Sequence, residues 1–210
     1  QGNKPQEAVA LCATARVYTA SDVPVEAVRA AQQAVTLCQE LGHSKGKACA
    51  QGAQAAASLG QSPEETVWLA SESLRVLRRL GCRAEEGTVL ETLAKAQAAQ
   101  GDFAKGLEAA QSALDLAVEL GDTVAEGVRT CIVAQMQTEL GKPTEGLSLA
   151  REALAKLRDF GDVALLIDAL DAVVNACLKA GEVEEGVRTL QDLQEDLRSQ
   201  GLELEEAHTL

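Results

Sequence analysis

The chain has 210 residues, a formal net charge of −13 and 46% hydrophobic residues, but only 2% aromatic residues. So acidic a protein repels phosphate backbones, and direct binding to nucleic acid is therefore not expected. No run of 18 or more apolar residues occurs, so no membrane span is predicted. Small Ala, Leu and Val side chains bury little area each, so the core needs close helix–helix contact over many residues.

The negative charge is concentrated in the C-terminal part of the chain. Residues 1–81 have a charge balance of +1, whereas residues 82–210 have a balance of −14. One interpretation is a solvated surface that keeps the protein in solution. The other is that the C-terminal half meets a basic partner.

Six cysteines are spread along the sequence, and none forms a CxxC pair. His43 and His208 do not supply a zinc-binding spacing, so no metal site is predicted. Most of the thiols fall at apolar helix positions, which favours an intracellular, reducing compartment. We expect this compartment to be the cytoplasm or, if a targeting peptide has been removed, an organelle. Cys82 falls in a predicted turn, where a reactive thiol is the alternative to a structural one.

Glycines recur at intervals close to twenty residues, which predicts one helix and one turn per interval. Each glycine suits the left-handed residue that ends a helix. Asp102, Asp122 and Asp162 follow such glycines and are expected to cap the next helix, which leaves about 16 helical residues per interval. The glycines are Gly42, Gly60, Gly81, Gly101, Gly121, Gly141, Gly161, Gly181 and Gly201.

Two kinds of helix alternate, so the true period is forty residues and the helices are expected in pairs. In the second helix of a pair a small residue comes early, as at Gly106, Gly146 and Gly186, and lets the partner helix approach closely. The second pair is the least regular, with glycine spacings of 18 and 21. The five pairs are expected at about 5–42, 43–81, 82–121, 122–161 and 162–201. Residues 202–210 are expected to form a C-terminal tail that either caps the last pair or begins another repeat.

The chain resembles the tetratricopeptide-repeat (TPR) family, in its longer forty-residue variety. The resemblance covers residues 5–201 and depends on segments such as Gly101-Asp102-Phe103, Gly106-Leu107 and Ala113-Leu114. The bulky aromatics of the first helix are mostly missing, and glycine replaces alanine at the helix-crossing position of three repeats. The resemblance implies an all-α, right-handed α-solenoid of about ten antiparallel helices whose first helices line a concave face.

The same resemblance implies a set of groove-facing residues. By the family's register, they are Arg16, Glu91, Lys95, Gln135, Asp171 and Asn175. A solvated face is the competing explanation, since a polar outer face is the default for an amphipathic helix. Their mixed charges do not indicate a particular ligand.

Trp68 is the single tryptophan, in the second helix of the irregular second pair. It lies beside the apolar stripe of that helix. Packing over the neighbouring repeat is the favoured interpretation. A partner anchor is the alternative, because tryptophan is enriched in interface hot spots.

No catalytic motif or cofactor-binding motif is found, and the acidic pairs fall in first helical turns, where carboxylates favour the positive helix end. The sequence therefore predicts a non-catalytic scaffold or adaptor, such as a subunit or assembly factor of a larger complex, that binds a protein or peptide along its concave face. The alternative is a regulatory or ligand-sensing helical module of a longer enzyme or signalling protein.

Overall fold

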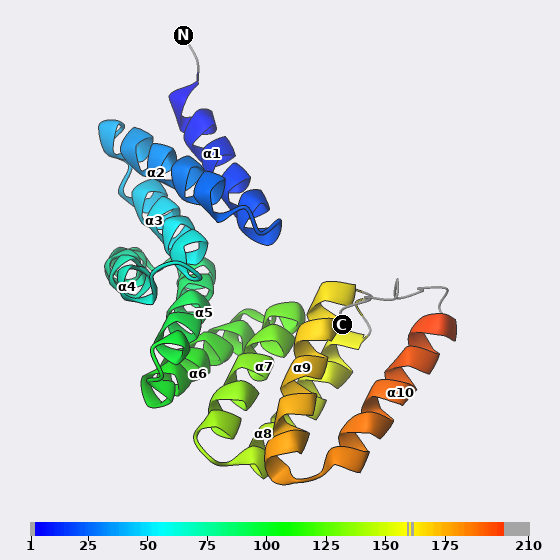
Figure 1. Ribbon diagram of the computed structural model, residues 1–210. Coiled ribbons are helices and arrows are strands. Elements are labelled where there is room, and N and C mark those ends of the chain that lie inside the picture. The colour runs from blue at the N-terminus through cyan, green and yellow to red at the C-terminus, as the bar shows by residue number, and fades with distance from the viewer. Residues whose placement is uncertain (1–2, 159, 161, 200–210) are drawn as a thin grey trace.

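The computed structural model describes residues 3–158, 160 and 162–199, and this part of the chain contains ten α-helices (Figure 1). None of these helices has the length and hydropathy of a membrane span in the described ranges. In chain order they are α1 (Lys4–Ala20), α2 (Pro24–Glu40), α3 (Ser44–Ser58), α4 (Pro63–Leu80), α5 (Arg83–Ala99), α6 (Phe103–Leu120), α7 (Thr123–Glu139), α8 (Pro143–Arg158), α9 (Val163–Ala180) and α10 (Val183–Ser199).

The helices form a solenoid in which each one packs against the next in antiparallel order. Each odd-numbered helix from α1 to α7 also contacts the following odd-numbered helix. Within the described ranges, the even-numbered helices contact only their neighbours in sequence. The odd-numbered helices therefore form the inner, concave side of the array, and the even-numbered helices form its outer side. Figure 1 shows the stack turning between α5 and α7, so that the chain describes an arc.

The turns follow the glycine period with two exceptions. Gly81, Gly121 and Gly181 end α4, α6 and α9 in the left-handed conformation, as predicted. The prediction for Gly60 is wrong, because Gly60 is not among the glycines with positive φ. Helix α3 has only 15 residues, and the Ser58 carbonyl accepts two N–H bonds, at 3.0 and 2.9 Å, from the irregular turn that follows.

The turn before α2 contains no glycine. Asp22 takes the left-handed conformation there, with φ of 53°. Short polar side chains tolerate this region better than most other residues. The predictions for Gly161, for Gly201 and for the tail 202–210 lie outside the described residues.

The predicted aspartate caps are confirmed. Asp102 accepts a hydrogen bond from the Lys105 N–H at 3.2 Å, and Asp122 accepts one from the Ala125 N–H at 2.9 Å. Asp162 accepts from two N–H groups of the first turn of α9. Each carboxylate thereby satisfies an N–H that has no partner within its helix.

The core is built from small side chains at short helix–helix distances. A Cβ added at Gly106 would lie 3.2 Å from the Ala94 carbonyl of the preceding helix α5 and 2.9 Å from the Met136 sulfur of α7. At Gly146 and Gly186 an added Cβ would also meet the preceding helix. The predicted close approach at these three glycines is confirmed. Helix α10 is the least covered, because Gly186 is its one buried residue among those whose side chains are described.

Candidate concave-face site

Helices α5, α7 and α9 carry five of the six residues that the family register selects. Glu91 and Lys95 lie one turn apart on α5 and form an ion pair at 2.8 Å. Half-buried Gln135 lies on α7. Asp171 and Asn175 lie on α9, where Asp171 is exposed and Asn175 is half-buried.

Cys131 of α7 lies near both neighbouring odd-numbered helices. Both Lys95 of α5 and Asp168 of α9 are close enough for their charges to act on the Cys131 thiol. Burial is the main cause that raises the pKa of Cys131 to about 12, so this thiol is protonated at neutral pH. Arg16, the sixth predicted residue, is exposed on α1 and is two odd-numbered helices away from α5. The structure therefore does not group it with the others.

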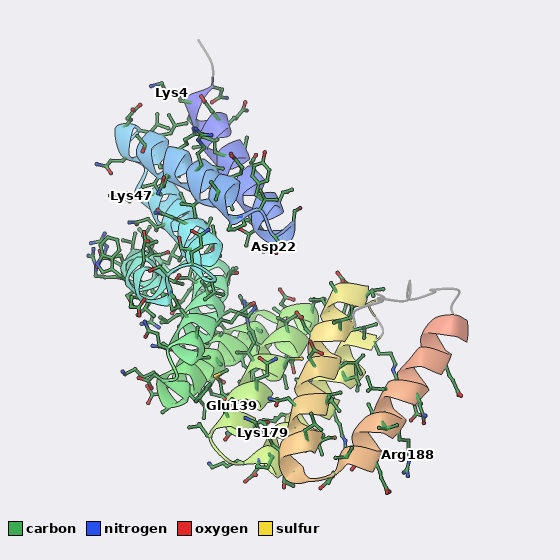
Figure 2. All side chains as sticks on the ribbon, in the orientation of Figure 1. Lys4, Asp22, Lys47, Glu139, Lys179 and Arg188 are labelled. Atoms are coloured by element: carbon green, nitrogen blue, oxygen red, sulfur yellow. The ribbon has the colours of Figure 1, made fainter. Side chains whose placement is uncertain are left out.

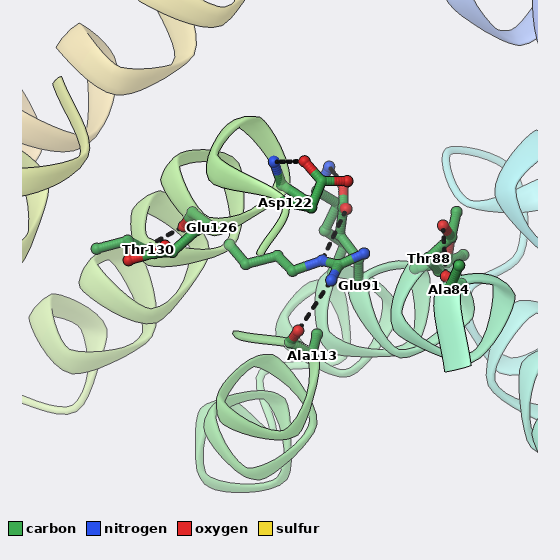
Figure 3. A network of polar contacts seen from close by, with 11 residues as sticks. Ala84, Thr88, Glu91, Ala113, Asp122, Glu126 and Thr130 are labelled. Carbon is green, nitrogen blue, oxygen red and sulfur yellow. Dashed lines mark hydrogen bonds and ion pairs between the residues drawn. The ribbon is translucent and has the colours of Figure 1, made fainter. Parts of the chain in front are cut away.

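A buried arginine supports the ion pair on α5. Arg129 of α7 is only 5% exposed, and its Nη1 donates to the Ala113 carbonyl at 2.9 Å (Figure 3). Its Nε lies 3.9 Å from Oε2 of Glu91 and has no hydrogen-bond partner. Desolvation lowers the pKa of Arg129, while Glu91 and Asp122 act in the opposite direction. Glu91 thus lies between two cations, exposed Lys95 and buried Arg129.

Gly87 makes room for this arginine. A Cβ added at Gly87 would lie 2.7 to 2.9 Å from three atoms of the Arg129 guanidinium. The guanidinium group therefore lies directly against the backbone of α5, at the place where the arc turns from α5 to α7. The sequence analysis missed Arg129. The one available signal was a glycine near the start of α5, inside the helix, where glycine weakens the helix unless something approaches its backbone closely.

A second polar cluster connects α7 with α9. The Glu139 carboxylate accepts a bond from Asn175 Nδ2 at 3.1 Å and pairs with the Lys179 ammonium at 2.6 Å. Figure 2 labels Glu139 and Lys179 on adjacent helices. The hydrogen bond from Lys179, and to a lesser extent the bond from Asn175, holds the pKa of the Glu139 carboxyl below its usual range. Asn175, which was predicted as a partner contact, therefore already has a partner within the chain.

Replacing Glu139 with Gln is expected to lower the free energy of unfolding at pH 7 by less than about 1 kcal/mol, because the pair is partly exposed. A carboxyl with a lowered folded pKa contributes stability above its unfolded pKa of about 4.3, and this contribution is lost as the pH falls through the folded value. Urea unfolding at pH 7, 5 and 3 should therefore show the difference shrinking on the acid side. The same difference at all three pH values would contradict this assignment, and Glu108→Gln at an exposed position of α6 is the control.

Two first-turn glutamates, forty residues apart, do more than complement the helix dipole. Glu86 of α5 is 6% exposed and accepts from Arg78 Nε of α4 at 2.8 Å. Glu126 of α7 pairs in the same way with Lys156 of α8. Each ion pair joins an odd-numbered helix to a neighbouring even-numbered helix. The sequence analysis explained the acidic pairs of first helical turns, of which Glu85-Glu86 is one, by the helix dipole alone, and this explanation was incomplete.

Trp68 does not pack over the neighbouring repeat, and the favoured sequence interpretation is wrong on this point. Its side chain on α4 is 61% exposed, while Leu69, Ala70 and Leu74 supply the buried stripe. The register places Trp68 on the outer side of the array. This leaves the anchor role untested.

Cys82 and His43 both lie directly before the first residue of a helix. Cys82 precedes α5, is half-buried and contacts the Leu80 carbonyl through sulfur at 3.9 Å. The His43 Nδ1 accepts from the Gly46 N–H at 3.1 Å and so caps α3. All six cysteines are free. Within the described ranges, no group of three or more His, Cys, Asp or Glu residues has the arrangement to hold a metal ion.

Ten helices in sequential antiparallel packing, with the odd-numbered ones on the inside, define a TPR-like helical-repeat fold. No protein-family profile and no curated protein matches the sequence. Among solved structures, the chain is similar to the nearly identical TPR-like repeats of a kinesin light chain homologue from Podosopora anserina, with 16% identity and a TM-score of 0.73. That match covers 95% of this chain and 99% of the other.

Two further structures are similar over less of their own length. Aspartyl phosphate phosphatase F from Bacillus subtilis has a TM-score of 0.74 at 14% identity, over 93% of this chain and 51% of that protein. A Rap protein in complex with Competence and Sporulation Factor has a TM-score of 0.71 at 12% identity, over 95% of this chain and 67% of that protein. At such low identities these similarities establish the fold alone.

Proposed function

We propose that this chain is a non-catalytic scaffold or adaptor that binds a protein or peptide along its concave face. The observation that supports the proposal is the presence of exposed or half-buried polar side chains on three successive odd-numbered helices, at Lys95 of α5, Gln135 of α7 and Asp171 of α9. An extended concave surface made of successive repeats is the usual binding surface of a solenoid. The Rap protein that shares this fold was solved with a bound factor, which supports the same use here.

The charge of the surface favours a basic segment at the α9 end of the face. Asp168 and Asp171 are both exposed, and within the described ranges the nearby lysines Lys95 and Lys179 pair with other carboxylates, Glu91 and Glu139. A lysine or arginine of the partner would supply the missing cations and would speed association through the negative field of residues 82–210. We also propose that the protein acts in an intracellular, reducing compartment, in keeping with its free thiols.

The five repeats at about 5–42, 43–81, 82–121, 122–161 and 162–201 form one binding unit in this proposal. A second candidate function is a regulatory or ligand-sensing module of a longer protein. It is favoured by the similarity to a signal-transduction ATPase from Pyrococcus horikoshii that has a tetratricopeptide-repeat sensor, with a TM-score of 0.68 over 31% of that chain. The two functions differ in whether binding changes the behaviour of a further domain.

The test is affinity purification from the native source, followed by a binding measurement with the purified partner. The variant replaces Lys95, Gln135, Asp171 and Asn175 with alanine. Glu91 is left intact because its removal would leave the buried cation of Arg129 without its nearest carboxylate. The matched control is Trp68→Ala on the outer side.

We expect the concave-face variant to lose at least tenfold in affinity and the control to bind as the wild type does. Lys95 and Asp171 are exposed, whereas Asn175 is half-buried and loses its bond to Glu139. Each substitution is expected to change stability by no more than about 1.5 kcal/mol, so circular dichroism should show a folded variant. Equal binding by the variant would overturn the concave-face assignment. Loss of binding in the Trp68 control instead would place the interface on the outer helices.

A further inference from the structure

A cavity of about 450 Å³ lies at the N-terminal end of the array, away from the α5–α9 face. Its walls come from three helices: Ala8 and Cys12 of α1, Cys38 at the end of α2, and Cys49 of α3. The capping residue His43 completes the wall between α2 and α3. Pockets for small molecules in proteins fall in the range of about 300–1,000 Å³ and are mostly apolar.

The walls are mostly apolar, because Val9 and Leu41 line the space together with Ala8 and the three thiols. Burial raises the pKa of Cys12, of Cys38 and of Cys49, the last to about 11. All three are therefore protonated at neutral pH, and a free thiol of this kind behaves as a small, polarizable hydrophobe. None of them is in a disulfide. Three soft thiols from three different helices thus face one space.

The polar part of the cavity wall is formed by His43 and Lys45. Lys45 adds no net charge to the cavity. The Lys45 ammonium is held by the Glu85 carboxylate at 2.6 Å, so its charge is already paired. Because the His43 Nδ1 accepts from the Gly46 N–H, the neutral ring carries its proton on Nε2 and keeps that N–H as a donor. A charged ligand would lose hydration in this space without gaining a counter-ion.

We propose that this cavity is a binding site for a small, neutral, largely apolar molecule with one hydrogen-bond acceptor, which accepts from the His43 ring. The thiols and Ala8 contact the apolar body of the ligand, and the acceptor sets its orientation. This site is independent of the concave-face function proposed above. It gives the N-terminal helices a ligand-binding role of their own.

The probe for the test is 6-propionyl-2-(dimethylamino)naphthalene, a neutral aromatic ketone whose emission shifts to the blue in apolar surroundings. Wild-type protein is expected to give a saturable blue shift with one site. Cys12→Phe fills the cavity and should weaken binding at least tenfold. His43→Ser keeps a capping oxygen but removes the ring donor, and it should weaken binding by about three- to tenfold. Trp68→Ala on α4 is the control and should bind as the wild type does.

Thiol labelling of the wild type keeps the proposal testable if a variant fails to fold. The bound ketone should slow modification of Cys12 and Cys49 by N-ethylmaleimide at least fivefold and leave Cys82, which is outside the cavity wall, unchanged. A non-saturable blue shift, unchanged binding by Cys12→Phe, or equal labelling rates with and without the ketone would each overturn the proposal. A doubled mass by light scattering, with Cys12 and Cys49 protected in the absence of the ketone, would show that a second copy fills the space and would also overturn it.

Discussion

Replacing Arg129 with alanine is expected to lower the free energy of unfolding by about 2–4 kcal/mol, the range for truncating a large buried side chain. The truncation leaves an empty volume between α5, α6 and α7 and removes the bond to the Ala113 carbonyl. Replacing Arg129 with methionine is expected to leave the free energy of unfolding unchanged or to raise it by about 1 kcal/mol. A buried charge with an unpaired Nε carries a desolvation cost that an apolar side chain of similar length does not have.

Urea denaturation of the wild type and both variants measures these differences directly. The alanine variant tests whether the position is a core position, and the methionine variant tests whether its charge stabilises the fold. A methionine variant as unstable as the alanine variant would show that the Glu91–Arg129 interaction stabilises more than desolvation costs. The concave-face interaction should survive in the methionine variant, since Glu91 retains Lys95 as a partner.

Replacing Gly146 with alanine is expected to destabilise the protein by about 1–3 kcal/mol, the usual cost of overpacking. In most exposed helices the same change stabilises by about 0.5–1 kcal/mol through helix propensity. Here the added Cβ would collide with Oγ1 of Thr138 and would lie 2.8 Å from the Ala134 carbonyl. The Thr138 hydroxyl already donates to that carbonyl at 2.8 Å, and the carbonyl is fixed in the backbone of α7.

Gly186→Ala is the matched control for this prediction, because it is the corresponding glycine forty residues later in α10. Its nearest neighbour is the Cys177 Cβ at 3.2 Å, which α10 can accommodate by a small shift. Thermal unfolding of the two variants should therefore differ, with the lower Tm for Gly146→Ala. Equal Tm values would show that α7 and α8 are less tightly packed than the structure indicates.

The sequence predicted the features that depend on local backbone chemistry. A glycine followed by aspartate identified the end of one helix and the cap of the next, because each residue satisfies backbone groups within a few positions. The prediction of a left-handed Gly60 failed because the turn after the short α3 instead donates two N–H bonds to the Ser58 carbonyl. The left-handed residue Asp22 was missed because the pattern considered only glycine.

The predictions that failed depend on contacts between helices distant in the sequence. The exposure of Trp68 could not be read from α4 alone, since its environment depends on how far α4 is covered by α3 and α5. From the sequence alone, Arg129 is expected at the surface. Its burial becomes apparent only when Gly87, 42 positions earlier, is known to lie opposite it. The family register selected positions on α5, α7 and α9, and their role in binding stays a prediction. It did not distinguish an exposed Asp171 from an Asn175 that already has a partner in Glu139.

The unequal contacts on the two sides of the array have a mechanical consequence. The odd-numbered helices contact one another, whereas the described even-numbered helices contact only their sequence neighbours. When the curvature of the array changes, the odd-numbered helices are expected to stay in contact with one another. The even-numbered helices can then move apart or together with little loss of buried surface. A change in curvature is therefore expected to disturb the core less than separating the odd-numbered helices from one another.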